Sequence, residues 1–231
     1  NLKKYAKQTK IGQGTFGEVF KVIEIDTETV FAAKISTSKL DESNIKFVMN
    51  LNREVNILSQ LNHPCILKFI GYSPFDFNQD TYPVIISEYT SNGSLNDIIK
   101  LDRQSISPQS WTDTKKLINL YGIASGMLYL HSHNIIHRDL KPANILVDSN
   151  FFPKIADFGL SKIYHQNIDS MTSQWTVELK GTPMYIAPEI WNDNEYSKAG
   201  DVYAFAFIAY ELFALEEPFK NYTINSLYSK V

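Results

Sequence analysis

The chain has a single cysteine, Cys65, among its 231 residues, so it cannot form a disulfide within itself. This fits a reducing compartment, and we expect an intracellular, cytoplasmic protein. No apolar run approaches the roughly 18 residues that a membrane-spanning helix needs, and the first residues lack the apolar core of a signal peptide. Because the chain also lacks an initiator Met, we expect it to be a domain excised from a longer protein.

No excess charge of one sign is present either. Lys and Arg number 22 and Asp and Glu number 25, which leaves a net charge of −3. We therefore expect neither nucleic acid nor an anionic membrane as the main partner. The sequence holds no internal repeat, and its 44% hydrophobic residues suffice for one large domain or two small lobes.

Polar residues suited to chemistry stand among short apolar runs between residues 137 and 159. Asp139 and Asn144 lie five residues apart, and Asp157 follows across a hairpin predicted to turn at residues 148–150. We expect this hairpin to bring the three side chains together. A carboxylate and an amide that converge can bind a hard cation such as Mg²⁺, which leaves the other carboxylate to accept a proton from a substrate hydroxyl.

This stretch closely resembles the catalytic and metal-binding loops of eukaryotic protein kinases. The motif H-R-D-L-x-x-x-N begins at His137, and the motif D-F-G begins at Asp157. The resemblance implies that Asp139 is the catalytic base and that Lys141 contacts the transferred phosphate, as in kinases acting on Ser and Thr. It also implies that Asn144 and Asp157 hold Mg²⁺.

A glycine pattern near the start of the chain is open to more than one interpretation. Gly12, Gly14 and Gly17 form GxGxxG, which dinucleotide-binding folds share with kinases. In a dinucleotide-binding fold the glycines open a helix, whereas here a run rich in β-branched and aromatic residues follows, from 18 to 25. The kinase arrangement is favoured, with Phe16 covering the phosphates, although the motif alone also fits an ordinary hairpin.

Two charged residues twenty positions apart continue the resemblance. Lys34 ends an apolar run, and Glu54 lies in a predicted amphipathic helix over residues 45–61. Either residue alone is typical of a solvated surface, but together they match the ion pair that positions ATP in kinases. The resemblance implies a nucleotide-binding set made up of Ile11, Gly12, Gly14, Gly17, Val19, Ala32, Lys34, Glu88, Thr90 and Leu146.

A hydroxyl-rich segment, residues 160–176, is closed by the sequence G-T-P-M-Y-I-A-P-E at 181–189. It resembles a kinase activation segment. The resemblance implies that Arg138 pairs with a phosphate added there, at Thr176 or Thr172, so an upstream activating kinase is an expected partner. The simpler alternative is a loop that is only soluble.

Two further helices are predicted, over residues 113–133 and 200–212. The first should carry one face made up of Leu117, Leu120, Ala124, Leu128 and His131. The second is apolar nearly all round, as for a buried helix, and the resemblance implies that Asp201 in it supports the catalytic-loop backbone. Three histidines, at 131, 133 and 137, lie close in sequence, but no further ligand shares a zinc-site spacing with them.

One departure from the family concerns Glu189, whose usual partner is a late arginine. No arginine follows Arg138. We therefore expect Glu189 to be a buried carboxylate without a partner, and the kinase domain to be incomplete at its C-terminal end.

These observations predict an α+β, bilobal protein kinase fold, with a small β-rich lobe over residues 1–88 and a larger helical lobe over 89–231. The predicted activity is phosphoryl transfer from ATP, with Mg²⁺, to Ser and Thr hydroxyls of a protein substrate. The alternative is a pseudokinase or nucleotide-binding scaffold, which usually lacks Lys34, Asp139 or Asp157. All three are present. The protein substrate, the oligomeric state and any further domains do not follow from the sequence.

Overall fold

The structure, a computed structural model, describes residues 1–14, 17–41, 43–163, 182–193 and 196–220. The chain divides into two compact units, Asn1–Ser91 and Asn92–Val231. The sequence predicts this boundary slightly earlier, after residue 88. The first unit is built on a sheet and the second mainly on helices, so the predicted α+β class of fold is confirmed.

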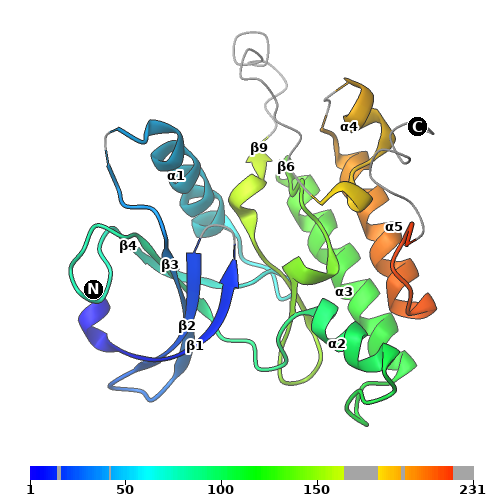
Figure 1. The fold of residues 1–231 in the computed structure, drawn as a ribbon, viewed down its shortest axis with the longest axis horizontal. Coiled ribbons are helices and arrows are strands. Elements are labelled where there is room, and N and C mark those ends of the chain that lie inside the picture. Colours follow the sequence, from blue (N-terminus) through cyan, green and yellow to red (C-terminus); the bar gives the residue numbers. More distant parts are fainter. Residues whose placement is uncertain (15–16, 42, 164–181, 194–195, 221–231) are drawn as a thin grey trace. The chain divides into compact units, whose positions relative to one another are not determined.

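One five-stranded antiparallel sheet forms the frame of the first unit (Figure 1). Its strands lie in the order β1-β2-β3-β5-β4. Their bounds are β1 (Tyr5–Gly14), β2 (Gly17–Glu24), β3 (Val30–Ser36), β4 (Phe69–Ser73) and β5 (Val84–Glu88), and the short 3-10 helix η1 (Leu2–Lys4) precedes them. Because β5 pairs with β3, residues more than fifty positions apart in the sequence lie opposite each other, as Ala32 and Ser87 do.

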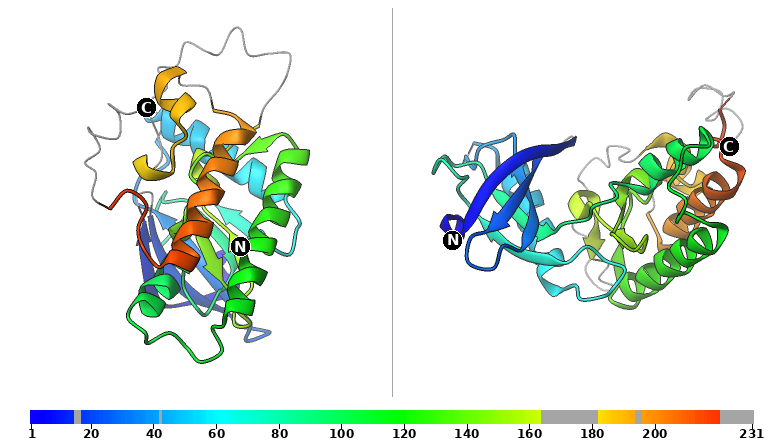
Figure 2. Two further views of the ribbon diagram at one scale, coloured as in Figure 1. Left: turned by 90° about the vertical axis from the view of Figure 1, so that its right-hand side faces the viewer. Right: turned by 90° about the horizontal axis from the view of Figure 1, so that it is seen from below.

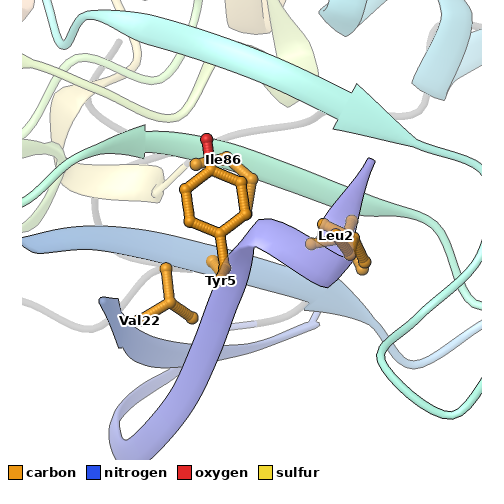
Figure 3. Packing of buried hydrophobic residues seen from close by; sticks show 6 residues of the cluster. Leu2, Tyr5, Val22 and Ile86 are labelled. Carbon is orange, nitrogen blue, oxygen red and sulfur yellow. The ribbon is translucent and has the colours of Figure 1, made fainter. Parts of the chain in front are cut away.

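Buried apolar side chains from several strands pack together against this sheet. Figure 3 shows Leu2, Tyr5, Val22 and Ile86 in this cluster. The Tyr5 ring meets Phe31 edge to face, with ring centroids 5.8 Å apart. Such aromatic pairs stabilise a core beyond the area that they bury.

Helix α1 (Ile45–Gln60) lies beside the sheet and contacts β4 (Figure 1). It begins after Asn44, whose side chain accepts a hydrogen bond from the amide of Phe47. Such a cap satisfies one of the backbone donors left open at a helix start. The helix buries Leu51, Ile57 and Leu58 on one face, as its apolar spacing predicts, and the acidic residue Glu54 lies on that same face.

Three longer helices form the frame of the second unit: α2 (Leu95–Arg103), α3 (Asp113–Ser132) and α5 (Lys198–Ala214). Helices α3 and α5 pack side by side (Figure 2). They contribute fully buried side chains, among them Ile123, Leu130, Ile208 and Leu212. The short elements η4 (Pro183–Tyr185) and α4 (Pro188–Asp193) precede α5.

Between α3 and η4 the chain forms short strands and single turns that carry the predicted chemistry. These elements are β6 (Ile135–Ile136), η2 (Pro142–Asn144), β7 (Ile145–Val147), β8 (Pro153–Ile155), η3 (Phe158–Leu160) and β9 (Lys162–Ile163). Strands β7 and β8 form a hairpin at the predicted turn, where the Asp148 carboxylate accepts from the amides of Asn150 and Phe152. Strand β6 pairs with β9.

Two expectations about the helices were wrong. Residues 101–110 are polar and irregular in sequence, which predicts a loop, yet Leu101–Arg103 form the last turn of α2. The face predicted for α3 is largely on the outside, where Leu117 and Leu128 are 59% and 72% exposed. Apolar residues occur on every side of this helix, so the spacing of apolar residues alone could not identify the face that is buried. Within the described residues no helix is both long and apolar enough to cross a membrane.

Candidate active site

The predicted glycine loop is the turn between β1 and β2, where Gly12 pairs with Val19 and Gly14 with Gly17. A Cβ atom added to Gly17 would lie 2.3 Å from the carbonyl oxygen of Ile35, so packing of the sheet requires glycine there. At Gly12 and Gly14 an added Cβ would meet nothing closer than 3.8 Å. Internal packing does not explain these two glycines, whereas a ligand that must approach the backbone closely would. Phe16 lies outside the described residues.

Lys34 and Glu54 form an ion pair across the first unit. The Lys34 ammonium on β3 lies 3.1 Å from a carboxylate oxygen of Glu54 on α1, and both side chains are largely shielded from solvent. Because both side chains are partly buried, loss of either charge would leave the other poorly solvated and without its partner. The pair therefore holds an ammonium group on the β3 strand in a defined position.

The strand positions predicted to surround a base lie on adjacent strands of the same sheet. Ala32 pairs with Ser87, and Glu88 ends β5, with Thr90 two residues later. The Glu88 amide donates to the carbonyl of Lys68, and the Glu88 carboxylate accepts from the Lys68 amide at 2.7 Å. Because the Glu88 amide already donates to Lys68, a backbone hydrogen bond between Glu88 and a nucleotide base would use the Glu88 carbonyl oxygen.

In the second unit, Asp139 lies at the centre of a hydrogen-bonded cluster. One carboxylate oxygen accepts from the Lys141 ammonium at 2.8 Å and from the Asn144 side-chain amide at 2.9 Å. The other accepts from the backbone amide of Thr182 at 3.3 Å. The Thr182 hydroxyl in turn accepts from Lys141 at 2.8 Å. A carboxylate fixed by three donors is well oriented to receive a proton from a hydroxyl group.

The backbone just before Asp157 is hydrogen-bonded to Asn144, because the amide of Ala156 donates to the carbonyl of Asn144 at 2.9 Å. The Asn144 side-chain NH₂ donates to Asp139, which leaves the amide oxygen as its group for a cation. Asp157 is exposed and has a left-handed backbone, with φ 62° and ψ 73°. Aspartate is one of the few residues other than glycine that adopt this conformation readily.

These two oxygen donors fit Mg²⁺, which prefers carboxylate and carbonyl oxygens and keeps several waters or phosphate oxygens. Among the described residues, no group of three or more His, Cys, Asp and Glu side chains converges as in a metal site. The histidines at 131, 133 and 137 bond instead to Asp201, to the Tyr129 carbonyl and to the Ala156 carbonyl. The zinc alternative therefore finds no support in these contacts.

Asp201, at the start of α5, supports the backbone that carries Asp139. Its carboxylate is 3% exposed and accepts from the amides of His137 and Arg138, at 2.9 and 3.0 Å. It also lies 2.8 Å from the ring of His131, a contact that sequence reasoning missed. The His137 ring packs against Phe158 of the D-F-G motif. The loop is thus braced by a helix more than sixty residues later in the chain.

Comparison with known proteins agrees with this geometry. The family model of the protein kinase domain matches residues 5–231. The chain belongs to the protein kinase family. A protein of Trypanosoma brucei brucei that carries a serine/threonine-protein kinase name is 30% identical over 99% of this chain. The serine/threonine-protein kinase polo of Drosophila melanogaster is 34% identical over 99% of the chain, and the dual specificity protein kinase shkB of Dictyostelium discoideum is 31% identical over 97%.

This kinase chain spans only part of those relatives. It covers 51% of the Trypanosoma protein, 37% of polo and 32% of shkB. The activities and substrates of those whole proteins therefore serve only as grounds for proposals about this chain.

A second polar group lies beside the kinase site and was missed by sequence reasoning. The Tyr185 hydroxyl, at the end of η4, donates to the carboxylate of Glu211 on α5. Burial raises the pKa of the Tyr185 phenol, and the hydrogen bond to Glu211 raises it further. The signal in the sequence is Glu211 itself, one of two acidic residues in an otherwise apolar helix.

The residues of the predicted phosphorylation switch are only partly described. Thr172 and Thr176 lie outside the described residues, and the Arg138 guanidinium lies 3.8 Å from the centre of the Tyr196 ring. Glu189, expected to be a buried carboxylate, is exposed on α4. The expectation of a buried Glu189 was wrong. In solvent the Glu189 carboxylate has no desolvation cost, so it does not need an arginine partner to offset one.

Proposed function

We propose that this kinase domain transfers the γ-phosphoryl group of ATP to Ser and Thr hydroxyls of protein substrates. The observation that carries the proposal is the cluster in which Lys141, Asn144 and Thr182 all donate to Asp139 or bond to one another. Such a cluster holds a base beside a cation, which is what the acceptor side of phosphoryl transfer needs.

The residues divide the work as follows. Asp139 orients the substrate hydroxyl and accepts its proton while the hydroxyl oxygen forms a bond to the γ-phosphorus. The bond from that phosphorus to the bridging oxygen of ADP breaks, and ADP leaves with the bonding electrons. Lys141 places positive charge near the oxygens of the transferred group. Lys34, held by Glu54, neutralises charge on the α- and β-phosphates.

Metal binding falls to Asn144 and Asp157. Both offer oxygen to a hard cation, and Mg²⁺ bound there would offset the negative charge of the phosphates. Gly12 and Gly14 leave room for the phosphates to approach the loop backbone. Lys141 and its partner Thr182 favour Ser and Thr as acceptors, as the relatives' names also suggest.

The rival is a pseudokinase that binds nucleotide without transfer. The presence of Lys34, Asp139 and Asp157, with the first two hydrogen-bonded to Glu54 and Lys141, argues against it. We expect partners to be a protein substrate and an upstream kinase acting on the segment before Thr182. A cytoplasmic location fits the single cysteine, Cys65.

The test is incorporation of labelled phosphate from ATP into a generic Ser/Thr substrate, with two matched variants. Asp139→Asn should abolish transfer and leave affinity for Mg-ATP largely intact, because Asp139 acts on the hydroxyl. Asp157→Asn should weaken both, since it removes a cation ligand. Calorimetry gives the affinities. An inactive wild-type protein, or equal loss of nucleotide affinity in both variants, would falsify the proposal.

A further inference from the structure

Asn119, in α3, is a polar side chain that is completely shielded from solvent. Its side-chain NH₂ donates to the carbonyl of Lys115, one turn earlier, at 2.8 Å and to the carbonyl of Phe151, in the β7–β8 hairpin, at 2.9 Å. Its amide oxygen has no hydrogen-bond partner among the described residues. A buried acceptor without a partner costs stability, so an apolar side chain would suit this place in the core better. The contact with Phe151 is what an apolar side chain could not supply.

Phe151 is an unusual residue for the backbone conformation that it adopts. Its φ of 62° lies in the left-handed region, which a bulky side chain rarely enters. The side chain is buried, and its ring packs against Trp111 with ring centroids 5.6 Å apart. The Phe151 amide donates to the carbonyl of Asp148 within the hairpin, whereas its carbonyl accepts from Asn119. Contacts from outside the hairpin thus help to offset the cost of this conformation.

The two strands of the hairpin are held by different parts of the second unit. Strand β7 is fixed by the segment before α2, because the amide of Val147 donates to the carbonyl of Gly93 at 2.9 Å. Strand β8 pairs with β7 and lies against α3, to which Asn119 ties the turn that precedes β8. Asn144 comes directly before β7, and Asp157 follows β8. The two oxygen donors for a cation therefore depend on different supports.

We propose that Asn119 is a positioning residue for the metal site, which holds the carbonyl of Phe151 and so fixes β8 where Asp157 and Asn144 can bind one Mg²⁺. The proposal deepens the proposed kinase function and rests on it. Groups that orient a metal ligand from behind affect metal affinity without touching the ion. Asn119 acts in this way through β8 and Asp157, so its effect must disappear when Asp157 no longer supplies a carboxylate.

Asn119→Leu tests the proposal in binding experiments that do not depend on phosphoryl transfer. Leucine has a similar size and removes the donor to Phe151. We expect the Mg²⁺ concentration needed for half-maximal binding of ADP to rise about tenfold, the lower end of the loss seen when the support of a metal ligand is removed. The Kd for adenosine, which has no phosphate for a cation to bind, should stay within about twofold of wild type. Calorimetry measures both.

A double-mutant cycle with Asp157→Asn shows whether the effect passes through the metal ligand. Asp157→Asn alone should raise the Mg²⁺ requirement at least as much as Asn119→Leu does, because it weakens the ligand itself. In the Asp157→Asn background, Asn119→Leu should change the Mg²⁺ requirement by less than about twofold. Residues that act as one unit are not additive, whereas independent residues are.

Ile208→Val is the control for a loss of stability without a loss of position. Ile208 is fully buried in α5, and removing one methyl group from a core residue lowers stability. We expect a lower midpoint of thermal unfolding and an unchanged Mg²⁺ requirement. The stoichiometry of adenosine binding gives the amount of folded protein, so unfolded protein does not count as weak binding. If Asn119→Leu does not fold, Asn119→Ala removes the same donor and takes its place.

The outcomes separate this inference from the proposed function. A wild-type protein whose binding of ADP does not depend on Mg²⁺ removes the metal site of the proposed function. A Mg²⁺-dependent wild type and an Asn119→Leu variant with the same Mg²⁺ requirement overturn only the inference. The inference also fails if Asn119→Leu has the same effect with and without Asp157→Asn, or if Ile208→Val raises the Mg²⁺ requirement equally, because Asn119 would then serve stability alone.

Discussion

The ammonium group of Lys141 lies 2.8 Å from the hydroxyl oxygen of Thr182 and equally close to the carboxylate of Asp139. One cation thereby joins the loop that carries the proposed base to the segment that begins η4. The contact with Asp139 is local, whereas Thr182 follows Lys141 by 41 residues. The position of Lys141 therefore depends on two segments, the loop with Asp139 and the segment with Thr182. Its charge stays in place beside Asp139 only while both hydrogen bonds are present.

Thr182→Val should reveal this dependence. The substitution keeps the shape of the side chain and removes the acceptor for Lys141, so we expect kcat to fall about tenfold with little change in the KM for ATP. Thr182→Ser keeps a hydroxyl and should remain close to wild type. Steady-state kinetics on a serine peptide measure both. Equal kcat values for the Val and Ser variants would contradict a role for the hydroxyl.

Glu54→Gln should weaken nucleotide binding. The amide removes the charge that balances Lys34 at 3.1 Å, and we expect the Kd for Mg-ATP to rise about tenfold because Lys34 is then held less firmly. Glu24→Gln is the matched control, since Glu24 pairs with Lys4 at 2.8 Å on the surface, where such pairs contribute little. Calorimetry that finds the same affinity for both variants would count against the assigned role.

The three glycines of the loop should respond differently to alanine. At Gly17 the new Cβ would collide with the Ile35 carbonyl at 2.3 Å, so Gly17→Ala should cost about 1–3 kcal/mol in the free energy of unfolding. At Gly14 the nearest atom is 4.0 Å away, so Gly14→Ala should leave stability intact and weaken ATP binding. Thermal unfolding and calorimetry check the two effects, and a stable Gly17→Ala variant would show that the sheet adjusts.

The ion pair between Asp102 and Lys116 should make stability depend on pH in acid. Burial alone would raise the pKa of Asp102, but the Lys116 ammonium at 2.7 Å and the Ser107 hydroxyl hold it below its ordinary value. The unfolded chain therefore binds a proton first as pH falls. The pair's contribution is complete above about pH 4 and is lost as pH falls through the lower folded pKa.

Lys116→Met tests this sign. The variant leaves the Asp102 carboxylate without its cation. Because Asp102 is only partly buried, we expect a loss of about 1–3 kcal/mol in the free energy of unfolding at neutral pH, less than for a fully buried pair. The difference from wild type should shrink as pH falls below about 4 and vanish below the lowered folded pKa of Asp102, where Asp102 is protonated in both proteins. Lys100→Met, at an exposed position on α2, is the control. A difference that stays constant from pH 7 to pH 3 would argue against this account.

Some of these features follow directly from local sequence. The predicted helix over residues 45–61 is α1, which ends one residue earlier at Gln60, because its apolar spacing matches the single face that it buries. The hairpin turn at 148–150 was predicted from its polar residues, and the structure adds the Asp148 hydrogen bonds that close it. Both elements depend on interactions between near neighbours.

Other features depend on contacts between distant segments and could not be predicted in this way. Nothing near Tyr185 in the sequence indicates that Glu211, 26 residues later, will accept its hydrogen bond. The buried face of α3 is chosen by its contacts with α5 and β8, since apolar residues occur on every side of the helix. Helix α2 did carry a local signal that was missed, the capping box between Ser94 and Asp97.

The bracing of the loop by Asp201 has a consequence for the order of events during synthesis. The ribosome makes His137, Arg138 and Asp139 before it makes α5, yet the amides of the first two are bonded to Asp201, more than sixty residues later. A nascent chain that ends before residue 198 thus carries the whole catalytic sequence without the group that orients it. Activity should appear only after α5 has emerged and packed, and hydrogen exchange at the amides of His137 and Arg138 would record that moment.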